Sequence, residues 1–326
     1  MLKRRSLVAG LAGATLLAST GSRAQEPWPT RTVKIVVPWP PGGGVDAFAR
    51  VIQAPLSAKL GQTVVIENIG GGAGRVGTQT AARAPADGYN FLLVNDTFAA
   101  TEALPIPGAM PLLPALAPVT FAISGPQGLF THPRSGLATA KDFVAAAKSK
   151  PGKLNVGVPG LGSSQHLTSE LLLRAAGDLS VTHVPYRGGG PLLQDLIAGN
   201  IDAGVVTFAA GAPQAKGGQL VALAVTSDKR SAAYRDVPTA SETIAPGFVQ
   251  TTWQGFLAPK ATAADVRARF HAALVAVLKE QAVIERLEQL GFEPTGLDGA
   301  EFAKLFDRTV DTFAGIAKER NIAAGD

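Results

Sequence analysis

The strongest constraint on the fold of this chain is its alternation of short β-branched runs with longer helical stretches. Residues 33–37 read Val-Lys-Ile-Val-Val and are predicted to form a strand; a glycine loop follows at 38–44, and a helical pattern covers 45–60. The same order recurs along the chain without a fixed-period repeat. Strands that alternate with helices are typical of α/β proteins. The sequence therefore predicts an α/β fold.

The other predicted elements continue this alternation. Further strands are expected at 64–69, 91–94, 119–124, 154–158, 181–185, 201–207 and 220–226, with an extended stretch at 252–256. Further helices are expected at 138–148, 165–176 and 191–199, with a short one inside 70–88 and two long ones that begin at Thr262 and Asp298. Asp265 and Glu301 stand three residues after these two starts, which is the spacing of a capping box.

The length of the chain indicates two domains. About 300 residues exceed the size at which one hydrophobic core usually stops growing. The segment 104–118 carries five prolines and is the best candidate for a connector. We assign 25–123 and 252–326 to the first domain and 124–251 to the second. The last helix has an apolar stripe that we expect to pack on the first domain, formed by Phe302, Leu305, Phe306, Phe313 and Ile316.

The first 24 residues are predicted to be a signal peptide. Lys3, Arg4 and Arg5 precede an apolar run at 7–18, and small residues stand before a cleavage site at Gln25. The apolar run is too short for a permanent membrane span. The arginine pair permits twin-arginine export, and ordinary secretion is equally compatible. We therefore expect a periplasmic protein.

Charge and cysteine content exclude several functions. The net charge of +5 includes four basic residues of the signal peptide and no acidic one, so the remaining chain has 26 basic residues against 25 acidic. Basic residues are not clustered, which excludes a footprint for nucleic acid or an anionic membrane. The absence of cysteine excludes disulfides, thiolate nucleophiles and an N-terminal lipid anchor. A free, monomeric protein is expected.

Three predicted strand-to-helix junctions are rich in glycine, at 40–46, 160–166 and 185–190. Glycine leaves backbone N–H groups at a helix start accessible, and the helix dipole favours an anion there. Such loops lie at the carboxyl ends of strands, where α/β proteins bind ligands, and both domains supply one. Each loop alone is also compatible with a simple tight turn. None has the Gly-Lys-Ser/Thr end of a phosphate loop or the spacing of a dinucleotide fingerprint.

Several side chains near these loops are candidates for ligand contact. Asp46 is expected mainly to favour the helix N-terminus and to pair with Arg50, with direct ligand contact as the alternative. Either Ser163 or Ser164 is predicted to be a helix N-cap. Tyr186 offers a ring and a hydroxyl. Arg187 is the one obvious cation beside a glycine loop, and it either contacts ligand or is simply solvated.

The residues give no sign of enzymatic chemistry, of a metal or of a cofactor. The histidines at 132, 166, 183 and 271 show neither an HExxH pattern nor a pair on one helix face. There is no Gly-x-Ser-x-Gly elbow. Ser164 and His166 stand too close in sequence to act as nucleophile and base. His166 is therefore expected to be structural rather than catalytic.

The sequence resembles the Bug family, the solute receptors of tripartite tricarboxylate transporters. The resemblance covers nearly all of the chain after the signal peptide. It rests on the segments 28–29, 33–46, 49–50, 66–68, 70–77, 86–89, 150–155, 162–167, 184–188, 223–227, 236–239 and 255–259. It implies a two-domain Venus-flytrap fold of the type II periplasmic binding protein class. It also implies that a small carboxylate is held in the cleft by main-chain and water-mediated contacts.

Carried over to this chain, the resemblance implies a pocket built from both domains. Its expected residues are Pro41, Gly42, Gly43, Gly44, Asp46, Asn95, Thr97, Gly162, Ser163, Ser164, His166, Tyr186, Arg187, Gly188, Thr207 and Phe208. Two segments depart from the family pattern. Residues 207–211 are mostly apolar where relatives usually carry a polar segment, and 99–118 lacks the usual Tyr-Asp-Pro-like stretch. We therefore expect a ligand with an apolar or aromatic tail.

The resemblance implies membrane transporter subunits as partners. Two alternatives remain at this point: a sensing protein that signals to a membrane kinase, and an enzyme on the same fold. A closing cleft and an exposed face serve transport and sensing equally, whereas an enzyme would need a paired acid and base.

Overall fold

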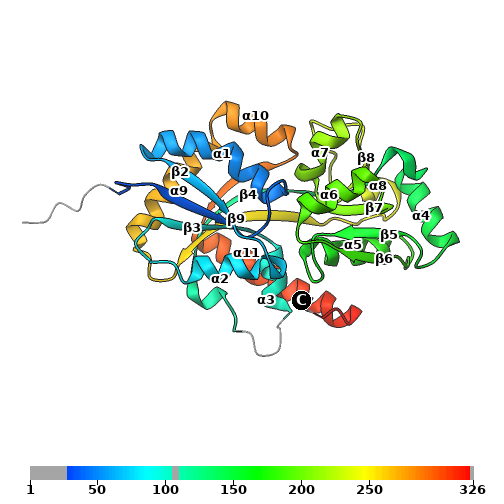
Figure 1. Cartoon of the computed structure of the whole chain (residues 1–326), viewed down its shortest axis with the longest axis horizontal. Helices are drawn as coiled ribbons and strands as arrows, with labels where there is room; N and C mark the ends of the chain where they lie inside the picture. The colour runs from blue at the N-terminus through cyan, green and yellow to red at the C-terminus, as the bar shows by residue number, and fades with distance from the viewer. Residues whose placement is uncertain (1–27, 105–109, 324–326) are drawn as a thin grey trace, which may run out of the picture.

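The strands of the chain join into one ten-stranded sheet that bends to form the centre of two lobes (Figure 1). The computed structural model describes residues 28–104 and 110–323; the predicted signal peptide lies outside this part of the chain. The strand order is β2-β1-β3-β9-β4-β7-β5-β6, with β10 and β8 also paired to β4. Strands alternate with helices throughout, so the predicted α/β class is confirmed.

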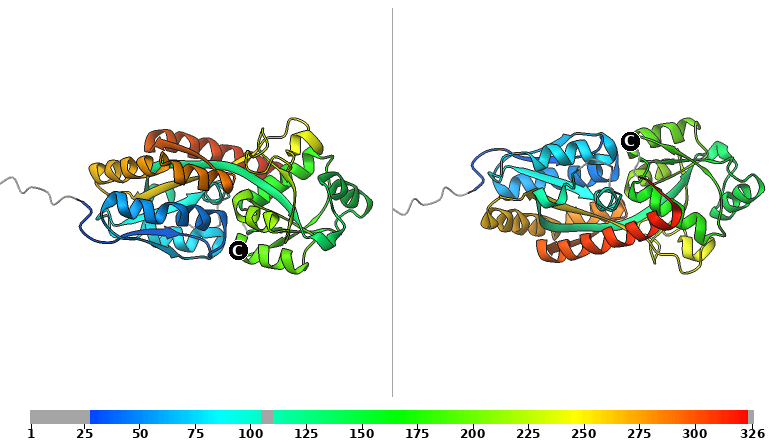
Figure 2. Two further views of the ribbon diagram at one scale, coloured as in Figure 1. Left: turned by 90° about the horizontal axis from the view of Figure 1, so that it is seen from above. Right: turned by 90° about the horizontal axis from the view of Figure 1, so that it is seen from below.

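The first lobe contains the strands at one end of this sheet and the helices around them (Figures 1 and 2). Parallel strands β2, β1 and β3 continue into antiparallel β9. The strands are β1 (Val33–Val37), β2 (Val64–Asn68), β3 (Asn90–Asn95), β9 (Thr251–Pro259) and β10 (Glu293–Asp298). The helices are α1 (Gly44–Leu60), α2 (Arg75–Ala82), α3 (Thr97–Ala103), α9 (Ala264–Leu278), α10 (Gln281–Gln289) and α11 (Gly299–Arg320).

The second lobe is built in the same way on the other end of the sheet. Parallel strands β6, β5 and β7 are flanked by antiparallel β4. The strands are β5 (Asn155–Val158), β6 (Thr182–Pro185), β7 (Ala203–Thr207) and β8 (Val221–Val225). The helices are α4 (Ala140–Ser149), α5 (Ser164–Ala175), α6 (Gly189–Ala198), α7 (Phe208–Lys216) and α8 (Ala240–Thr243), and three short 3-10 turns (Gly72–Gly74, Leu113–Ala115 and Pro133–Ser135) lie elsewhere in the chain.

Strand β4 (Leu116–Thr131) belongs to both lobes, as its curved path in Figure 2 shows. It pairs with β9 from Leu116 to Pro126 and with β7 from Gln127 to Thr131. The predicted strand ended at residue 124, and this end is wrong. Gly125 and Pro126 look like strand breakers in sequence, but pairing with β9 holds them in extended conformation.

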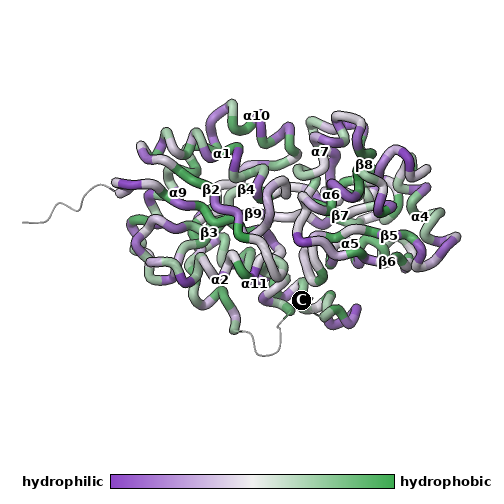
Figure 3. The backbone as a smooth tube through the Cα atoms, in the orientation of Figure 1, coloured by the Kyte–Doolittle hydropathy of each residue, from purple (hydrophilic) through white to green (hydrophobic). Residues whose placement is uncertain are grey.

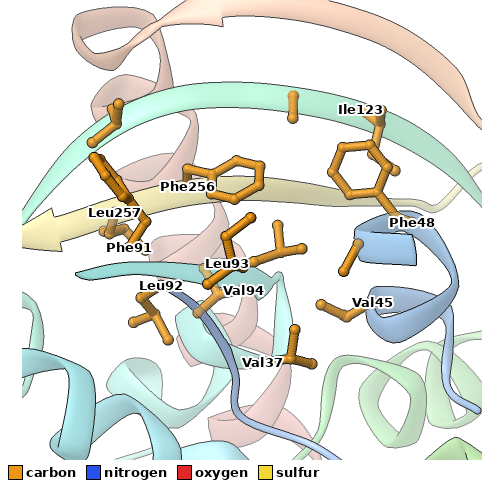
Figure 4. Close-up of a cluster of buried hydrophobic side chains, with 14 of the residues drawn as sticks. Val37, Val45, Phe48, Phe91, Leu92, Leu93, Val94, Ile123, Phe256 and Leu257 are labelled. Atoms are coloured by element: carbon orange, nitrogen blue, oxygen red, sulfur yellow. The ribbon is translucent and has the colours of Figure 1, made fainter. Parts of the chain in front are cut away.

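Each lobe has its own apolar core. The first consists of one large cluster that contains the buried faces of α1, α9 and α11. Phe48 of α1 lies beside Ile123 of β4 and Phe256 of β9 (Figure 4), and Phe91 stacks on Phe270 with ring centroids 3.8 Å apart. In the second lobe, two clusters cover the two faces of the sheet. Apolar residues concentrate on the central strands of the first lobe (Figure 3). Complete burial of one such phenylalanine contributes about 1.5–3 kcal/mol.

Helix α11 packs on the first lobe, as its apolar stripe predicts. Phe302, Phe306 and Phe313 are buried in the first core, and Phe306 contacts Phe98 of α3 with ring centroids 5.2 Å apart. The end of the helix extends to the second lobe. There Arg320 pairs with Asp178 at 3.2 Å, and the preceding Glu319 pairs with Arg174 of α5.

The predicted caps of the two long helices have different outcomes. The N-cap of α9 is Ala263 rather than Thr262, because the Thr262 N–H donates to Pro259 in a turn that delays the helix by one residue. The predicted cap of α11 is confirmed, since Asp298 Oδ1 accepts from two N–H groups at 2.9 and 3.0 Å. Strand β10 and helices α3, α7, α8 and α10 were not predicted. In the described residues no helix is both long enough and apolar enough to span a membrane.

Candidate ligand-binding site

The carboxyl ends of five strands meet where the two lobes face each other. Strands β1 and β3 of the first lobe lead into α1 and α3, and strands β5, β6 and β7 of the second lobe lead into α5, α6 and α7. Helix N-termini from both lobes therefore surround one space. The first turn of each helix has N–H groups without an intrahelical partner. The space between the lobes is rich in such donors.

A narrow inner cleft of about 30 Å³ lies at the centre of this region. It has room for one or two water molecules. Six residues expected from the sequence line it: Gly43, Gly44, Asp46, Asn95, Thr97 and Thr207. Gln165 of the expected loop 162–166 also lines it, and its side-chain nitrogen donates to Thr207 Oγ1 at 3.3 Å. Ala210 of the apolar segment 207–211 lines it together with Val206, which was not predicted. The inner cleft is thus polar on the side of α1 and α5 and apolar on the side of α7.

A wider outer cleft of about 630 Å³ continues from the inner one. Trp39, Pro40 and Pro159 line both spaces. The expected residues Tyr186 and Arg187 line the outer cleft, together with the glycine segment 70–74 and the loop residues 159–161. The Tyr186 hydroxyl donates to Asp195 at 2.8 Å, and together with burial this hydrogen bond raises the pKa of Tyr186 to about 12.

The remaining expected residues lie around the two clefts without lining them. Ser163 is the N-cap of α5, as predicted, and accepts from the His166 N–H at 3.2 Å. Phe208 points into the second lobe, where its ring stacks on Phe130 at 5.6 Å. Pro41, Gly42, Gly162, Ser164 and Gly188 belong to the loops and helix starts behind the lining.

Glycines allow the two lobes to touch beside the inner cleft. A Cβ atom added to Gly190 of α6 would lie 2.4 Å from the Pro41 carbonyl oxygen. One added to Gly44 of α1 would lie 2.7 Å from Thr207 Cβ. Both distances are shorter than a normal carbon contact. The two lobes are therefore closed on each other, and a side chain at Gly190 or Gly44 would prevent this contact.

Asp46 organises the first glycine loop. Its Oδ2 accepts from the Gly42 N–H at 3.0 Å and from Arg50 at 2.8 Å, and its Oδ1 accepts from Asn68 at 3.1 Å. Burial raises the pKa of this carboxyl, but the hydrogen bonds from Arg50, Gly42 and Asn68 outweigh burial and lower it overall. The predicted pair with Arg50 is present. Asp46 is an ionised group whose charge is already compensated.

His166 holds the second glycine loop from behind. Its Nδ1 accepts from the Gly162 N–H at 3.1 Å. Burial, with a smaller effect of His183, lowers the pKa of His166 to about 4, so the ring is neutral at physiological pH. This agrees with a structural role.

His166, Glu170 and His183 bring potential metal ligand atoms within 4.8 Å of one another. The spacing of the histidines alone does not indicate this trio, because one member is a glutamate. His183 Nδ1 pairs with Glu170 at 3.3 Å and its Nε2 with Ser169 at 2.9 Å. The acceptor role of His166 Nδ1 leaves the proton on Nε2, the atom that would have to face an ion. Hydrogen bonds therefore explain why these three side chains lie close together, and their contacts join α5 to β6.

Asp96, which was not predicted as a site residue, stands between the expected residues Asn95 and Thr97. Its side chain is buried where α3, α5 and β9 meet. Oδ1 accepts from Ser164 at 2.8 Å and from Thr252 at 2.7 Å. Burial raises the pKa of Asp96 to about 7 despite these hydrogen bonds.

Comparison with known proteins decides the family. The model of the family described as "Tripartite tricarboxylate transporter family receptor" matches residues 48–322. The chain belongs to this family. It is 31% identical over 294 residues to Protein BugT of Bordetella pertussis (strain Tohama I), which covers 90% of each chain. The resemblance to the Bug family and the two-domain periplasmic binding protein fold are both confirmed.

Two solved structures of similar proteins contain carboxylates. Rpa4515 of R. palustris, solved with adipate, has a TM-score of 0.86 and 31% identity over 91% of this chain and 99% of its own. MatC of Rhodopseudomonas palustris, solved with bound malate, has a TM-score of 0.81 and 29% identity over 89% and 99%. A solute-binding role follows for this member of the receptor family.

Proposed function

We propose that this protein is a periplasmic receptor that captures a small carboxylate between its lobes for a tripartite tricarboxylate-type transporter. The observation that carries the proposal is the inner cleft, where helix starts and neutral amide and hydroxyl groups from both lobes converge. We also propose that the lobes are the domains 25–123 with 252–326 and 124–251, and that β4 and β9 form the hinge. The change of partner along β4 supports this division.

The inner cleft has the chemistry to hold a carboxylate group. The α1 helix begins at Gly44 with its first N–H groups beside the cleft, and its dipole favours negative charge. Asn95, Thr97 and Gln165 add neutral donors. Asp46, the acidic residue of the lining, is ionised, and Arg50 together with its other hydrogen bonds compensates its charge. An anionic head group can therefore be held in this space.

The rest of the ligand would extend along the apolar side of the inner cleft and into the outer cleft. Val206 and Ala210 face the inner space, and Trp39 lines both. We propose a carboxylate with an apolar or aromatic body, in agreement with the apolar segment 207–211. A tricarboxylate such as citrate would leave charged groups against these side chains without partners, which costs binding free energy.

A thermal-shift screen of the purified protein from Gln25 onward tests this function. The panel contains adipate, malate, citrate, aromatic monoacids and amino acids. A ligand bound only by the folded state raises the melting temperature, and at 100 times its Kd it adds about 2.7 kcal/mol of stability. We expect the largest rise with an apolar or aromatic acid. Preference for citrate would contradict the proposed body, and no rise with any carboxylate would refute the proposed function.

A matched pair of variants localises the binding to the inner cleft. Asn95→Ala removes a lining amide, whereas Asn200→Ala removes an exposed amide at the end of α6. We expect Asn95→Ala to abolish most of the thermal shift and Asn200→Ala to retain it. Equal loss in both variants, or in neither, would place the ligand elsewhere.

Export and partnership are separate parts of the proposal. Mass spectrometry of the periplasmic fraction should find a monomeric chain that begins at Gln25. Cross-linking in whole cells should join it to an integral membrane carrier. Recovery of a membrane sensor kinase instead would support signalling rather than transport.

A further inference from the structure

Asp96 connects three parts of the structure at the junction of the lobes. It precedes α3 of the first lobe, accepts from Ser164 at the start of α5 in the second lobe, and accepts from Thr252 at the start of β9. Its neighbour Thr97 adds a contact of 3.1 Å to the same Ser164 hydroxyl. Groups from both lobes therefore enclose the Asp96 carboxyl in this structure.

The groups that stabilise a negative charge on Asp96 are all neutral: the Thr252 and Ser164 hydroxyls and the backbone N–H groups of Asp96 and Thr97 lower its pKa, and none of them is a cation. The side chain is fully buried, and Oδ2 has no hydrogen-bond partner among the described residues. Both donors to Oδ1 are neutral hydroxyls. Burying a carboxylate without a cation costs several kcal/mol of folding free energy. Burying a neutral carboxyl group, whose carbonyl oxygen accepts hydrogen bonds from two hydroxyls, costs far less. The closed geometry favours the protonated form.

We propose that Asp96 takes up a proton when the lobes close, so that this cleft captures its anionic ligand together with one proton. The anionic ligand in this statement rests on the function proposed above. In the open form Ser164 moves away with the second lobe, and water reaches the Asp96 carboxylate. The proton comes from solvent at closure and returns to solvent at opening.

Charged groups on the elements around Asp96 are engaged elsewhere. On α5, His166 and Glu170 interact with each other and with His183. Glu102 on α3 accepts from the N–H groups of Leu112 and Leu113. Strand β9 carries no ionisable residue, and the acidic and basic residues of α11 beside α3, such as Asp307 and Arg308, are exposed. Desolvation is thus the main cause of the raised pKa of Asp96.

Proton uptake at closure determines how ligand affinity depends on pH. Closure binds a proton, so raising the pH opposes closure and weakens ligand binding. With a pKa of about 7 in the closed form and the ordinary value of 3.8 in the open form, affinity falls about tenfold per pH unit between these two values. Asp96→Asn is neutral at every pH and should lose this part of the pH dependence.

The proposal can be tested without a ligand, because the closed form can be trapped. A Cβ atom on Gly43 would lie 4.0 Å from the Gly189 nitrogen, and one on Gly189 would lie 3.6 Å from the Gly43 Cα. Each added Cβ atom thus lies within 4.0 Å of the opposite backbone, so the two backbones are close enough for cysteines at these positions to be tested for a disulfide. The chain has no cysteine of its own, so the double variant Gly43→Cys, Gly189→Cys can form only this bridge.

The measurement is the titration of aspartate carboxyl carbons by NMR in the oxidised and reduced double variant. Adding Asp96→Asn to the same background identifies the Asp96 signal. We expect a midpoint near pH 7 in the oxidised protein and near 4 after reduction. A midpoint below 5 in the oxidised protein, the same midpoint after reduction, or failure of the bridge to form would overturn the proposal. A negative carboxylate screen would refute the proposed function and leave this titration unaffected.

Discussion

Gly190→Ala should weaken closure of the two lobes on a ligand while leaving the folding stability of each lobe nearly unchanged. The added Cβ would lie 2.4 Å from the Pro41 carbonyl oxygen in the opposite lobe, about 1 Å inside an ordinary contact. The carbonyl belongs to the backbone, so it cannot rotate away as a side chain can. Overpacking of this kind costs about 1–3 kcal/mol. If closure bears the whole cost, ligand affinity falls about 5- to 140-fold.

The same substitution should not destabilise the second lobe. Gly190 is in the first turn of α6, where alanine is intrinsically a better helix former than glycine by up to about 1 kcal/mol. It also precedes Pro191, whose ring disfavours helical conformation at a residue with a Cβ atom, and this opposes the gain. Isothermal titration with the carboxylate selected by the thermal-shift screen measures affinity, and urea unfolding measures stability. We expect weaker binding together with an unfolding free energy within about 1 kcal/mol of the unsubstituted protein. Small-angle X-ray scattering at saturating ligand should show a more open particle.

Gly315→Ala is the matched control for this experiment. Gly315 is also helical, but no heavy atom lies within 4 Å of an added Cβ. Because Ile316 rather than proline follows it, its variant should gain the helix stability that alanine provides and keep its affinity. If Gly190→Ala binds within twofold of the unsubstituted protein, the lobes do not close through this contact and the reasoning is wrong.

Three further predictions concern individual side chains. Asp46→Ala removes the acceptor of the Asn68 amide and of the Gly42 N–H, and it should lower the unfolding free energy in urea by about 1–3 kcal/mol at pH 7. Because folding lowers the pKa of Asp46, this stabilisation is present above pH 3.8 and is lost as the pH falls through the folded pKa. The stabilities of the variant and the parent should therefore converge in acid. The pKa of His166 is lowered from 6.5 to about 4, so its contribution to stability is present above pH 6.5 and declines toward pH 4; His166→Asn should flatten that part of the stability profile. Arg187→Ala should weaken binding of a ligand that reaches the outer cleft, whereas Arg308→Ala on exposed α11 should not, as titration calorimetry would show.

The sequence predicted the α/β class and the elements with strong local signals. The strand at 33–37 and the cap at Asp298 depend on neighbouring residues, and both are present. Strand β10 was missed because Glu-Pro-Thr-Gly-Leu-Asp lacks a β-branched run and is extended only through pairing with β4. The end of β4 was misplaced for the same reason, since long-range pairing outweighs local preference.

The candidate site was predicted in part. Gly43, Gly44 and Thr207 line the inner cleft as expected, because glycine loops at strand ends are a local signal with a fixed place in the fold. The contact of Gly190 with the opposite lobe depends on how the lobes meet, and no local pattern contains that information. Asp96 was missed because its burial is created by α5, which is distant in sequence.

Helix α11 has a consequence for the conditions under which the receptor works. Its aromatic side chains anchor it in the first lobe, while its last turn forms ion pairs with Arg174 and Asp178 of the second. These partly exposed charges face water, where dissolved ions screen attraction over about 8 Å at physiological ionic strength. We therefore expect these ion pairs, and with them the attachment of the last turn of α11 to the second lobe, to weaken as the ionic strength rises.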